Sequence, residues 1–159
     1  MLTKANILVD KTGSARLADF GLLTVISDPT NFIASSSYAH GGTARWMSPE
    51  LIDPEQFGFE KYRPTEASDC YALGMVIYET ISGRLPFHDH TDLNVFMKVT
   101  RGERPRRGRG FANNLWKMLE LCWKSQADVR PSIKDVLLCL EQTSNLSEPR
   151  SKSPPVDEE

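Results

Sequence analysis

One stretch of the chain, residues 66–82 (EASDCYALGMVIYETIS), limits the possible folds more than any other segment. Its apolar residues lie on nearly every side of a helix, and they are Ala67, Tyr71, Ala72, Leu73, Met75, Val76, Ile77, Tyr78 and Ile81. A helix that is apolar all round must be buried. Gly83 and Pro86 then supply a stop signal. The sequence therefore predicts a central helix with other elements packed around it.

Three further segments are predicted to be the helices that surround this one. Residues 91–100 and 113–124 carry apolar side chains at helical spacing, and a last helix is predicted to begin at Pro131, a favoured first helical residue. Their apolar positions are Leu93, Phe96 and Met97; Leu115, Met118, Leu119 and Cys122; and Ile133, Val136, Leu137 and Leu140. Trp116 and Trp123 are expected to join the core. The predicted fold class is mainly α.

A short β-hairpin is predicted at the start of the chain. Residues 7–9 and 15–18 are β-prone and flank a turn-forming stretch, Asp10–Gly13. Opposed residues of an antiparallel pair lie about 5 Å apart, so Asn6 and Asp19 are expected to meet at the open end. One amide oxygen and one carboxylate form a sparse oxygen site that suits Mg²⁺, which takes further ligands from water and phosphates. The alternative is that Asp19 caps a turn and Asn6 binds backbone.

Two segments carry no regular pattern. Residues 22–49 show no sustained period, and so long a connection inside a compact domain is typical of a functional segment. After Asn145 the chain is polar and proline-rich, with nothing to bury. We therefore predict one domain over residues 1–143 and a disordered polar tail over residues 144–159.

The composition argues against several classes of protein. The 159 residues, 40% apolar and 25% charged, suffice for one globular domain. The net charge of -2 gives no overall attraction to nucleic acid or anionic membranes. No apolar run approaches the roughly 18 residues of a membrane span. Cys70, Cys122 and Cys139 form no CxxC pair, so we expect buried thiols in a reducing compartment, cytoplasmic or nuclear.

Five motifs occur in the order found in one family. Asp19-Phe20-Gly21, a long polar loop and Ser48-Pro49-Glu50 resemble the DFG-to-APE activation segment of protein kinases. The upstream KANIL resembles the end of their catalytic loop. SDCYALGMVIYETISGRLPF and LCWKSQADVRPSIKDVLLCLE are similar to their central and closing helices. The resemblance covers residues 1 to about 142 and implies the C-terminal lobe of a kinase, with a small N-terminal β-hairpin and a long activation segment.

Shorter features resemble one group within this family. GGTARWMSPE, with the CW and RPS elements, is similar to the tyrosine-kinase-like group of serine/threonine kinases. Thr43 matches a position typical of serine/threonine specificity. The resemblance implies transfer of the γ-phosphate of ATP to a protein serine or threonine, with Mg²⁺ as cofactor.

The resemblance also implies roles for single residues. Asp19 would hold the Mg²⁺ that bridges the β- and γ-phosphates, and Asn6 would hold a second ion. Phe20 would pack beneath, and Gly21 would let the loop change conformation. Glu50 and Arg130 match two positions that form a buried ion pair in the family. Asp69 would accept backbone hydrogen bonds at the start of the central helix and brace the catalytic loop.

The activation segment contains several hydroxyl groups, on Ser35, Ser36, Ser37, Tyr38 and Thr43. Phosphorylation would add about -2 charge to each and could order the segment. We expect at least one of them to be modified, although a solvated polar loop fits any single serine equally well.

The sequence departs from the family pattern at the position of the catalytic base. Met1 occupies the position of the catalytic aspartate, and Thr3 occupies that of a lysine. The 159 residues also contain no counterpart of the glycine-rich loop, the strand lysine or its glutamate partner. A positioned general base contributes about 10²- to 10⁴-fold. We therefore expect a truncated kinase domain without measurable activity on its own.

The alternative function is a non-catalytic, pseudokinase-like module that binds other proteins. An isolated lobe is expected to expose apolar surface that a partner protein would cover. Nucleic acid is a weaker possibility, based on the five arginines of RGERPRRGRG at residues 101–110. No aromatic residue lies inside that run, and it falls where the family has a GxRP loop. His88-Asp89-His90 is expected to be a solvated loop, because a third metal ligand is lacking.

Overall fold

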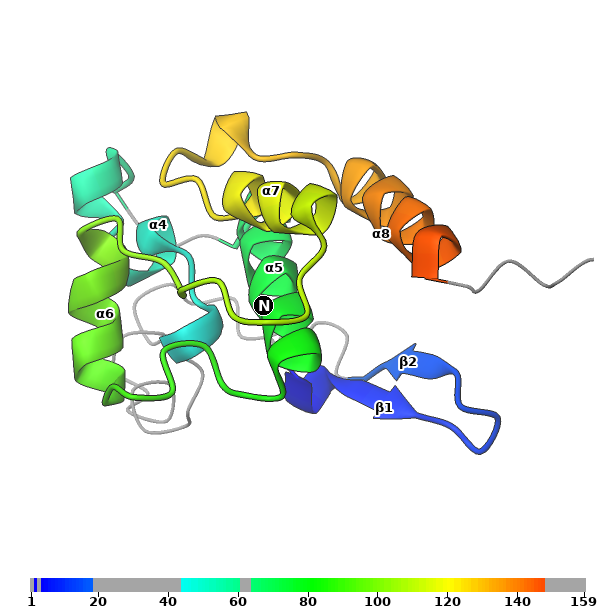
Figure 1. Ribbon diagram of the computed structural model, residues 1–159. Helices are drawn as coiled ribbons and strands as arrows, with labels where there is room; N and C mark the ends of the chain where they lie inside the picture. Colours follow the sequence, from blue (N-terminus) through cyan, green and yellow to red (C-terminus); the bar gives the residue numbers. More distant parts are fainter. Residues whose placement is uncertain (1, 3, 19–43, 61–63, 148–159) are drawn as a thin grey trace, which may run out of the picture.

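A computed structural model describes residues 2, 4–18, 44–60 and 64–147 of the chain (Figure 1). The regular elements are strands β1 (Ile7–Val9) and β2 (Ala15–Leu17) and helices α4 (Pro49–Ile52), α5 (Glu66–Ser82), α6 (Asp92–Thr100), α7 (Asn113–Cys122) and α8 (Ile133–Ser147). Single 3-10 turns occur at Lys4–Asn6, Ala44–Trp46, Glu55–Phe57 and Ala127–Val129. The predicted class, a mainly α lobe with a small hairpin, is confirmed.

Helix α5 lies at the centre of the helical part and has the predicted bounds, with α7 packed against it (Figure 1). Cys70, Tyr71 and Ala72, three successive residues that point about 100° apart, are all buried, which confirms that the apolar surface extends round the helix. The helix begins with a capping box, in which the Thr65 side chain accepts from the Ser68 amide and the Ser68 hydroxyl accepts from the Thr65 amide. It ends at Gly83, whose φ of 67° is unstrained only in glycine.

Helices α5 and α7 approach closely at one glycine. A Cβ atom on Gly74 would lie 2.7 Å from Trp123 Nε1 and 3.0 Å from the Cβ of Cys122. The Trp123 indole fills this space and makes edge contacts with Tyr78 and Trp116, at ring-centroid distances of 6.0 and 5.7 Å. The end of α7 therefore packs directly on the backbone of α5.

Three predicted helix boundaries were shifted. The helix predicted at 91–100 begins one residue later, because Thr91 is its N-cap and accepts from the Asn94 amide. The helix predicted at 113–124 ends at Cys122.

The last helix begins at Ile133 instead of Pro131. Ser132 and Asp135 form reciprocal hydrogen bonds, so the capping side chain, and not the proline, sets the start. This helix continues to Ser147, so residues 144–147 are helical where we had predicted a disordered tail; residues 148–159 lie outside the described part.

The N-terminal hairpin forms as predicted, except that the second strand ends at Leu17, one residue earlier than predicted. The strands pair antiparallel with Ile7 opposite Leu17 and Val9 opposite Ala15. At the turn, Asp10 Oδ1 accepts hydrogen bonds from the Thr12 amide (2.9 Å), the Thr12 hydroxyl (2.6 Å) and the Ser14 amide (3.0 Å). The Arg16 guanidinium donates to Asp10 Oδ2 at 3.0 Å. One carboxylate thus holds the turn together.

These donors set the pKa of Asp10, and with it the pH dependence of the hairpin. The Thr12 hydroxyl contributes most, followed by Arg16, and together with the backbone amides they lower the pKa of Asp10 from 3.8 to about 2. Since the folded pKa lies below the unfolded one, the stabilisation is present above pH 3.8 and is lost as pH falls through about 2. Carboxyl-carbon NMR should give a midpoint near 2, and Thr12→Ala should raise it. A wild-type midpoint at the ordinary value would contradict this assignment.

Candidate functional site

The first predicted site residue, Asn6, lies where the hairpin opens. It ends a 3-10 turn that leads into β1, and its backbone carbonyl accepts a hydrogen bond from the Ala18 amide at 2.7 Å. Its side chain is half-buried. This hydrogen bond places Ala18 beside Asn6, and Asp19 is the next residue in the chain.

Most of the other predicted site residues lie outside the described part of the chain. These are Met1, Asp19, Phe20, Gly21, Ser35, Ser36, Ser37, Tyr38 and Thr43. The position of the Asp19 carboxylate relative to Asn6, and the predicted roles of the activation-segment residues, therefore stay predictions.

The segment that follows Thr43 is buried beside the central helix. Ala44 and Trp46 lie in a 3-10 turn that contacts both α5 and α6, and Ser48 is fully buried before α4 begins. Arg45 was not singled out from the sequence. Its guanidinium donates to the carbonyls of Pro86 (2.8 Å), Phe87 (2.7 Å) and His90 (2.7 Å), and it pairs with Asp92 at 3.0 Å. One arginine thus joins this segment to the loop after α5.

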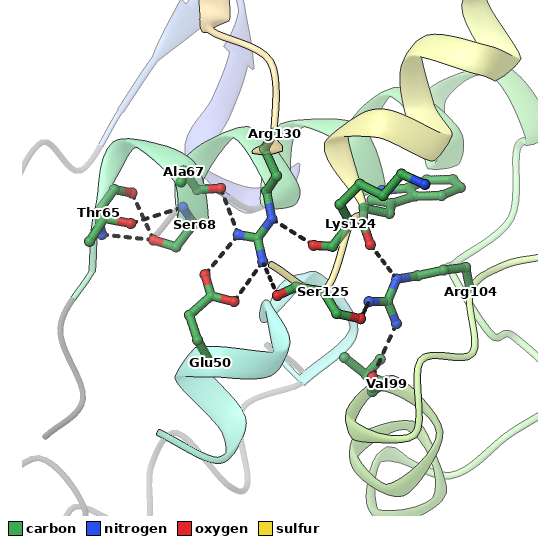
Figure 2. A network of polar contacts seen from close by, with 10 residues as sticks. Glu50, Thr65, Ala67, Ser68, Val99, Arg104, Lys124, Ser125 and Arg130 are labelled. Atoms are coloured by element: carbon green, nitrogen blue, oxygen red, sulfur yellow. Dashed lines mark hydrogen bonds and ion pairs between the residues drawn. The ribbon is translucent and has the colours of Figure 1, made fainter. Parts of the chain in front are cut away.

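Glu50 and Arg130, which are 80 residues apart, are brought together in a buried ion pair (Figure 2). The two guanidinium nitrogens donate to the two carboxylate oxygens, each at 2.7 Å. The Arg130 side chain is 0% exposed and that of Glu50 is 6% exposed. Arg130 also donates to the backbone carbonyls of Lys124 (2.8 Å), Ala67 (2.9 Å) and Ser125 (3.3 Å). The guanidinium therefore connects α4, α5 and the segment after α7.

The charges of this pair are maintained in spite of burial. Burial alone would raise the pKa of Glu50, but the hydrogen bonds and the positive charge of Arg130 outweigh it and hold the pKa below its usual value. Glu50 is therefore ionised at neutral pH. The Tyr71 ring lies 5.2 Å from the Arg130 guanidinium, and burial raises the pKa of the Tyr71 hydroxyl to about 12.

A second inward-facing arginine lies beside this pair. Arg104 donates to the Trp123 carbonyl (2.6 Å), the Val99 carbonyl (3.0 Å) and the Ser125 hydroxyl (3.0 Å), as Figure 2 shows in part. Its guanidinium lies 5.4 Å from the Tyr71 ring centroid. The sequence pattern grouped Arg104 with four other arginines of one run, whereas the structure uses it to join α6 to the end of α7. In the sequence, the proline that follows Arg104 in the GxRP pattern was the feature that could have distinguished this arginine from the other four.

Asp69 lies in the first turn of α5, and its side chain is exposed. Its amide donates to the Thr65 carbonyl at 3.0 Å. The brace from its carboxylate to the catalytic loop stays a prediction.

Other classes of site find no support among the described residues. Those residues include no group of three or more His, Cys, Asp or Glu that could hold a metal ion. His88 pairs with Asp89 at 3.0 Å. All three cysteines are buried and free of disulfide bonds. Over the same described ranges, no helix has the length and apolar character to cross a membrane.

Comparison with known proteins gives a consistent result. The family model described as "Protein tyrosine and serine/threonine kinase" matches residues 1–140. A "Probable serine/threonine-protein kinase" of Dictyostelium discoideum is 30% identical over 140 residues, which cover 88% of this chain and 14% of that protein. A "Mitogen-activated protein kinase kinase kinase 1a" of Physcomitrium patens is 34% identical over 135 residues, 84% of this chain and 16% of that protein.

A third relative, the "Dual specificity protein kinase shkC" of Dictyostelium discoideum, is 28% identical over 142 residues, 88% of this chain. The chain spans only 26% of its length. In each of these three relatives the matching region is therefore a minor part of a much longer protein.

Proposed function

This chain belongs to the protein tyrosine and serine/threonine kinase family, and we propose that it supplies the helical, substrate-side lobe of a kinase that phosphorylates serine or threonine. The observation that carries the proposal is the family match over residues 1–140. Relatives with serine/threonine kinase names support the choice of acceptor. GGTARWMSPE supports placement in the tyrosine-kinase-like group, with Thr43 beside the substrate.

The nucleotide site proposed for this lobe lies at the open end of the hairpin. Its donor set, an amide oxygen from Asn6 and a carboxylate from Asp19, consists of the hard oxygen ligands that Mg²⁺ prefers. Mg²⁺ bound with ATP would neutralise the negative charge that develops during phosphoryl transfer. The pairing of Ala18 with Asn6 supports this placement, because it brings the chain back to Asn6 one residue before Asp19.

The residues of the lobe would orient the reactants rather than transfer a proton. At the position of the family's base stands Met1, whose thioether does not accept a proton at neutral pH. The contacts of Arg45 with the loop after α5 and of Arg130 with Glu50 fix the segment after Thr43 in place, so this segment is suited to holding a protein substrate. Phosphorylation of one of Ser35, Ser36, Ser37, Tyr38 or Thr43 is proposed to order the segment before it.

Exposed apolar side chains on both faces of the hairpin support a further part of the proposal. Leu8, Val9 and Leu17 are 57%, 71% and 51% exposed, an unusual exposure for apolar strand residues. We propose that another protein surface covers them. The three buried thiols, Cys70, Cys122 and Cys139, are consistent with a reducing compartment, the cytoplasm or the nucleus.

We expect the 159-residue polypeptide to bind Mg-ATP weakly at the hairpin and to transfer no phosphate by itself. Two oxygen ligands give weak binding, and positioning of the phosphates supplies most of the catalysis in this family. Addition of millimolar Mg-ATP should shift the backbone NMR signals of Asn6 and Ala18. Asp19→Asn should abolish the shifts, whereas Asp128→Asn, which changes an exposed carboxylate elsewhere, should preserve them.

The same titration separates the two candidate functions. Unchanged signals at Asn6 with saturating Mg-ATP would reject the nucleotide site and favour the pseudokinase-like interaction module. Labelled phosphate transferred to casein, and lost in Asp19→Asn, would instead disprove the expected lack of activity.

A further inference from the structure

A basic groove opens on the side of the lobe, between the loop after α5 and the loop before α7. It has a volume of about 650 Å³, within the range of pockets that hold small ligands. Its basic side chains are Arg84, Lys98, Arg104, Arg106, Arg107 and Arg109. Its carboxylates are those of Asp89 and Glu103. We call this feature the arginine groove.

Both carboxylates of the arginine groove are already engaged. Glu103 accepts from Lys98 Nζ at 2.6 Å, and Asp89 lies 3.0 Å from His88 Nε2. Neither carboxylate forms an ion pair with Arg106 or Arg109.

Two of the arginines are also engaged, by the fold itself. Arg104 is directed inward to three backbone carbonyls and one hydroxyl. Arg107 donates to the Phe111 carbonyl (2.5 Å) and to Asn113 Oδ1 (2.7 Å), with its guanidinium 5.9 Å from the Trp116 ring. These side chains hold the loop in place.

Arg106 and Arg109 differ from them. Both are exposed, and within the described part of the chain their side chains have no hydrogen bond or ion pair. The backbone of their loop is nevertheless fixed by two contacts with α5. The Tyr78 hydroxyl donates to the Arg106 carbonyl at 3.2 Å, and the Tyr78 ring stacks on that of Phe111 with a centroid distance of 5.5 Å. A held backbone that presents free guanidinium groups reduces the ordering cost of binding an anion.

We propose that the arginine groove binds a phosphorylated segment of a partner protein, with Arg106 and Arg109 as its phosphate ligands. A guanidinium donates two parallel hydrogen bonds to a phosphate, and clusters of arginines are a recurrent means of reading phosphorylated peptides. The site does not depend on phosphate transfer by this chain.

The same groove is a poor match for nucleic acid. Single strands bind through aromatic rings on which bases stack. Apart from the imidazoles of His88 and His90, the rings that line the groove are those of Tyr78 and Phe87, and both are buried, with 6% and 9% of their surfaces exposed. The net charge of -2 also gives no general attraction to a polyanion.

The proposal is tested with the 159-residue polypeptide immobilised on a resin. The probes are short degenerate peptides with one fixed central phosphoserine, and the same peptides with serine or glutamate in its place. Because a phosphate accepts more and stronger hydrogen bonds than a hydroxyl group, we expect at least about tenfold greater retention of the phosphoserine set. The double variant R106Q/R109Q should lose this preference.

A charge-matched control distinguishes the groove from general attraction. The double variant R101Q/K117Q removes the same charge from exposed residues outside the groove and should retain the phosphoserine peptides. Equal retention of the glutamate or serine peptides, or an unchanged preference in R106Q/R109Q, would overturn the proposal. Tighter binding of a single-stranded DNA oligomer or of phosphatidylserine vesicles would also overturn it.

A second measurement needs no variant. In the wild-type protein, phosphoserine peptides should shift the side-chain Nε–H NMR signals of Arg106 and Arg109. The signal of Arg104, which is already hydrogen-bonded, should change little. Shifts confined to Arg104, or absent from all three, would contradict the assignment.

Discussion

Replacing Arg130 with alanine is expected to lower the free energy of unfolding by about 3 to 5 kcal/mol, because it leaves the buried Glu50 carboxylate without its partner. The same change removes the donors to the carbonyls of Ala67 and Lys124. Small domains are stable by only about 5 to 15 kcal/mol, so much of the folded margin would be lost. Urea denaturation followed by circular dichroism measures the loss.

The exposed pair of Lys98 and Glu103 provides the control. Its N–O distance of 2.6 Å is as short as those of the buried pair, but its side chains are 28% and 49% exposed. Because water screens such a pair, Lys98→Ala should cost no more than about 1 kcal/mol. Equal losses in Arg130→Ala and Lys98→Ala would show that burial of the Glu50 pair contributes nothing.

The pair also has a defined pH dependence. Since the folded pKa of Glu50 is lowered, its stabilisation is present above the ordinary glutamate pKa and is lost as pH falls through the lowered value. Acid should therefore reduce the stability difference between the wild type and Arg130→Ala.

The central helix could be predicted from sequence to the residue because its signals are local. Thr65 and Gly83 bound an uninterrupted apolar stretch, and each acts through its own side chain or backbone conformation. The start of α8 illustrates the limit of such signals. Pro131 and Ser132 are adjacent helix-start residues, and only the bonds between Ser132 and Asp135 decide between them.

The candidate site could be predicted less well from the sequence, because its contacts join segments that are far apart in the chain. Nothing in the spacing of Glu50 and Arg130 indicates that they meet, and the expectation came only from resemblance to a family. Arg45 and Arg104 were missed because a sequence does not show whether an arginine points into the fold or into solvent. Both lie in short motifs that the sequence had singled out, GGTARWMSPE and GERP, so the motif was the available signal.

Trp123→Ala is expected to lower the free energy of unfolding by about 3 to 5 kcal/mol, the usual cost of removing a large buried aromatic side chain. The indole is 2% exposed and contacts the rings of Tyr78 and Trp116. Alanine keeps the backbone carbonyl that accepts from Arg104, so the measurement isolates the packing of the ring. Trp116, which is half-buried in α7, the helix that ends just before Trp123, is the matched control, and Trp116→Ala should cost less.

The contact between Trp123 and Gly74 predicts that their effects are not additive. Gly74→Ala alone should cost about 1 to 3 kcal/mol, because its methyl group would overlap the indole. In the Trp123→Ala background the nearest obstacle is gone, and the next atom, the Cβ of Cys122, lies at 3.0 Å. The cost of Gly74→Ala should therefore fall by at least about 0.5 kcal/mol, the lower limit of coupling between residues in contact. Gly108→Ala, where the nearest atom is 4.0 Å away, should show no such coupling. Additive losses at Gly74 and Trp123 would mean that the indole does not determine the need for glycine in α5.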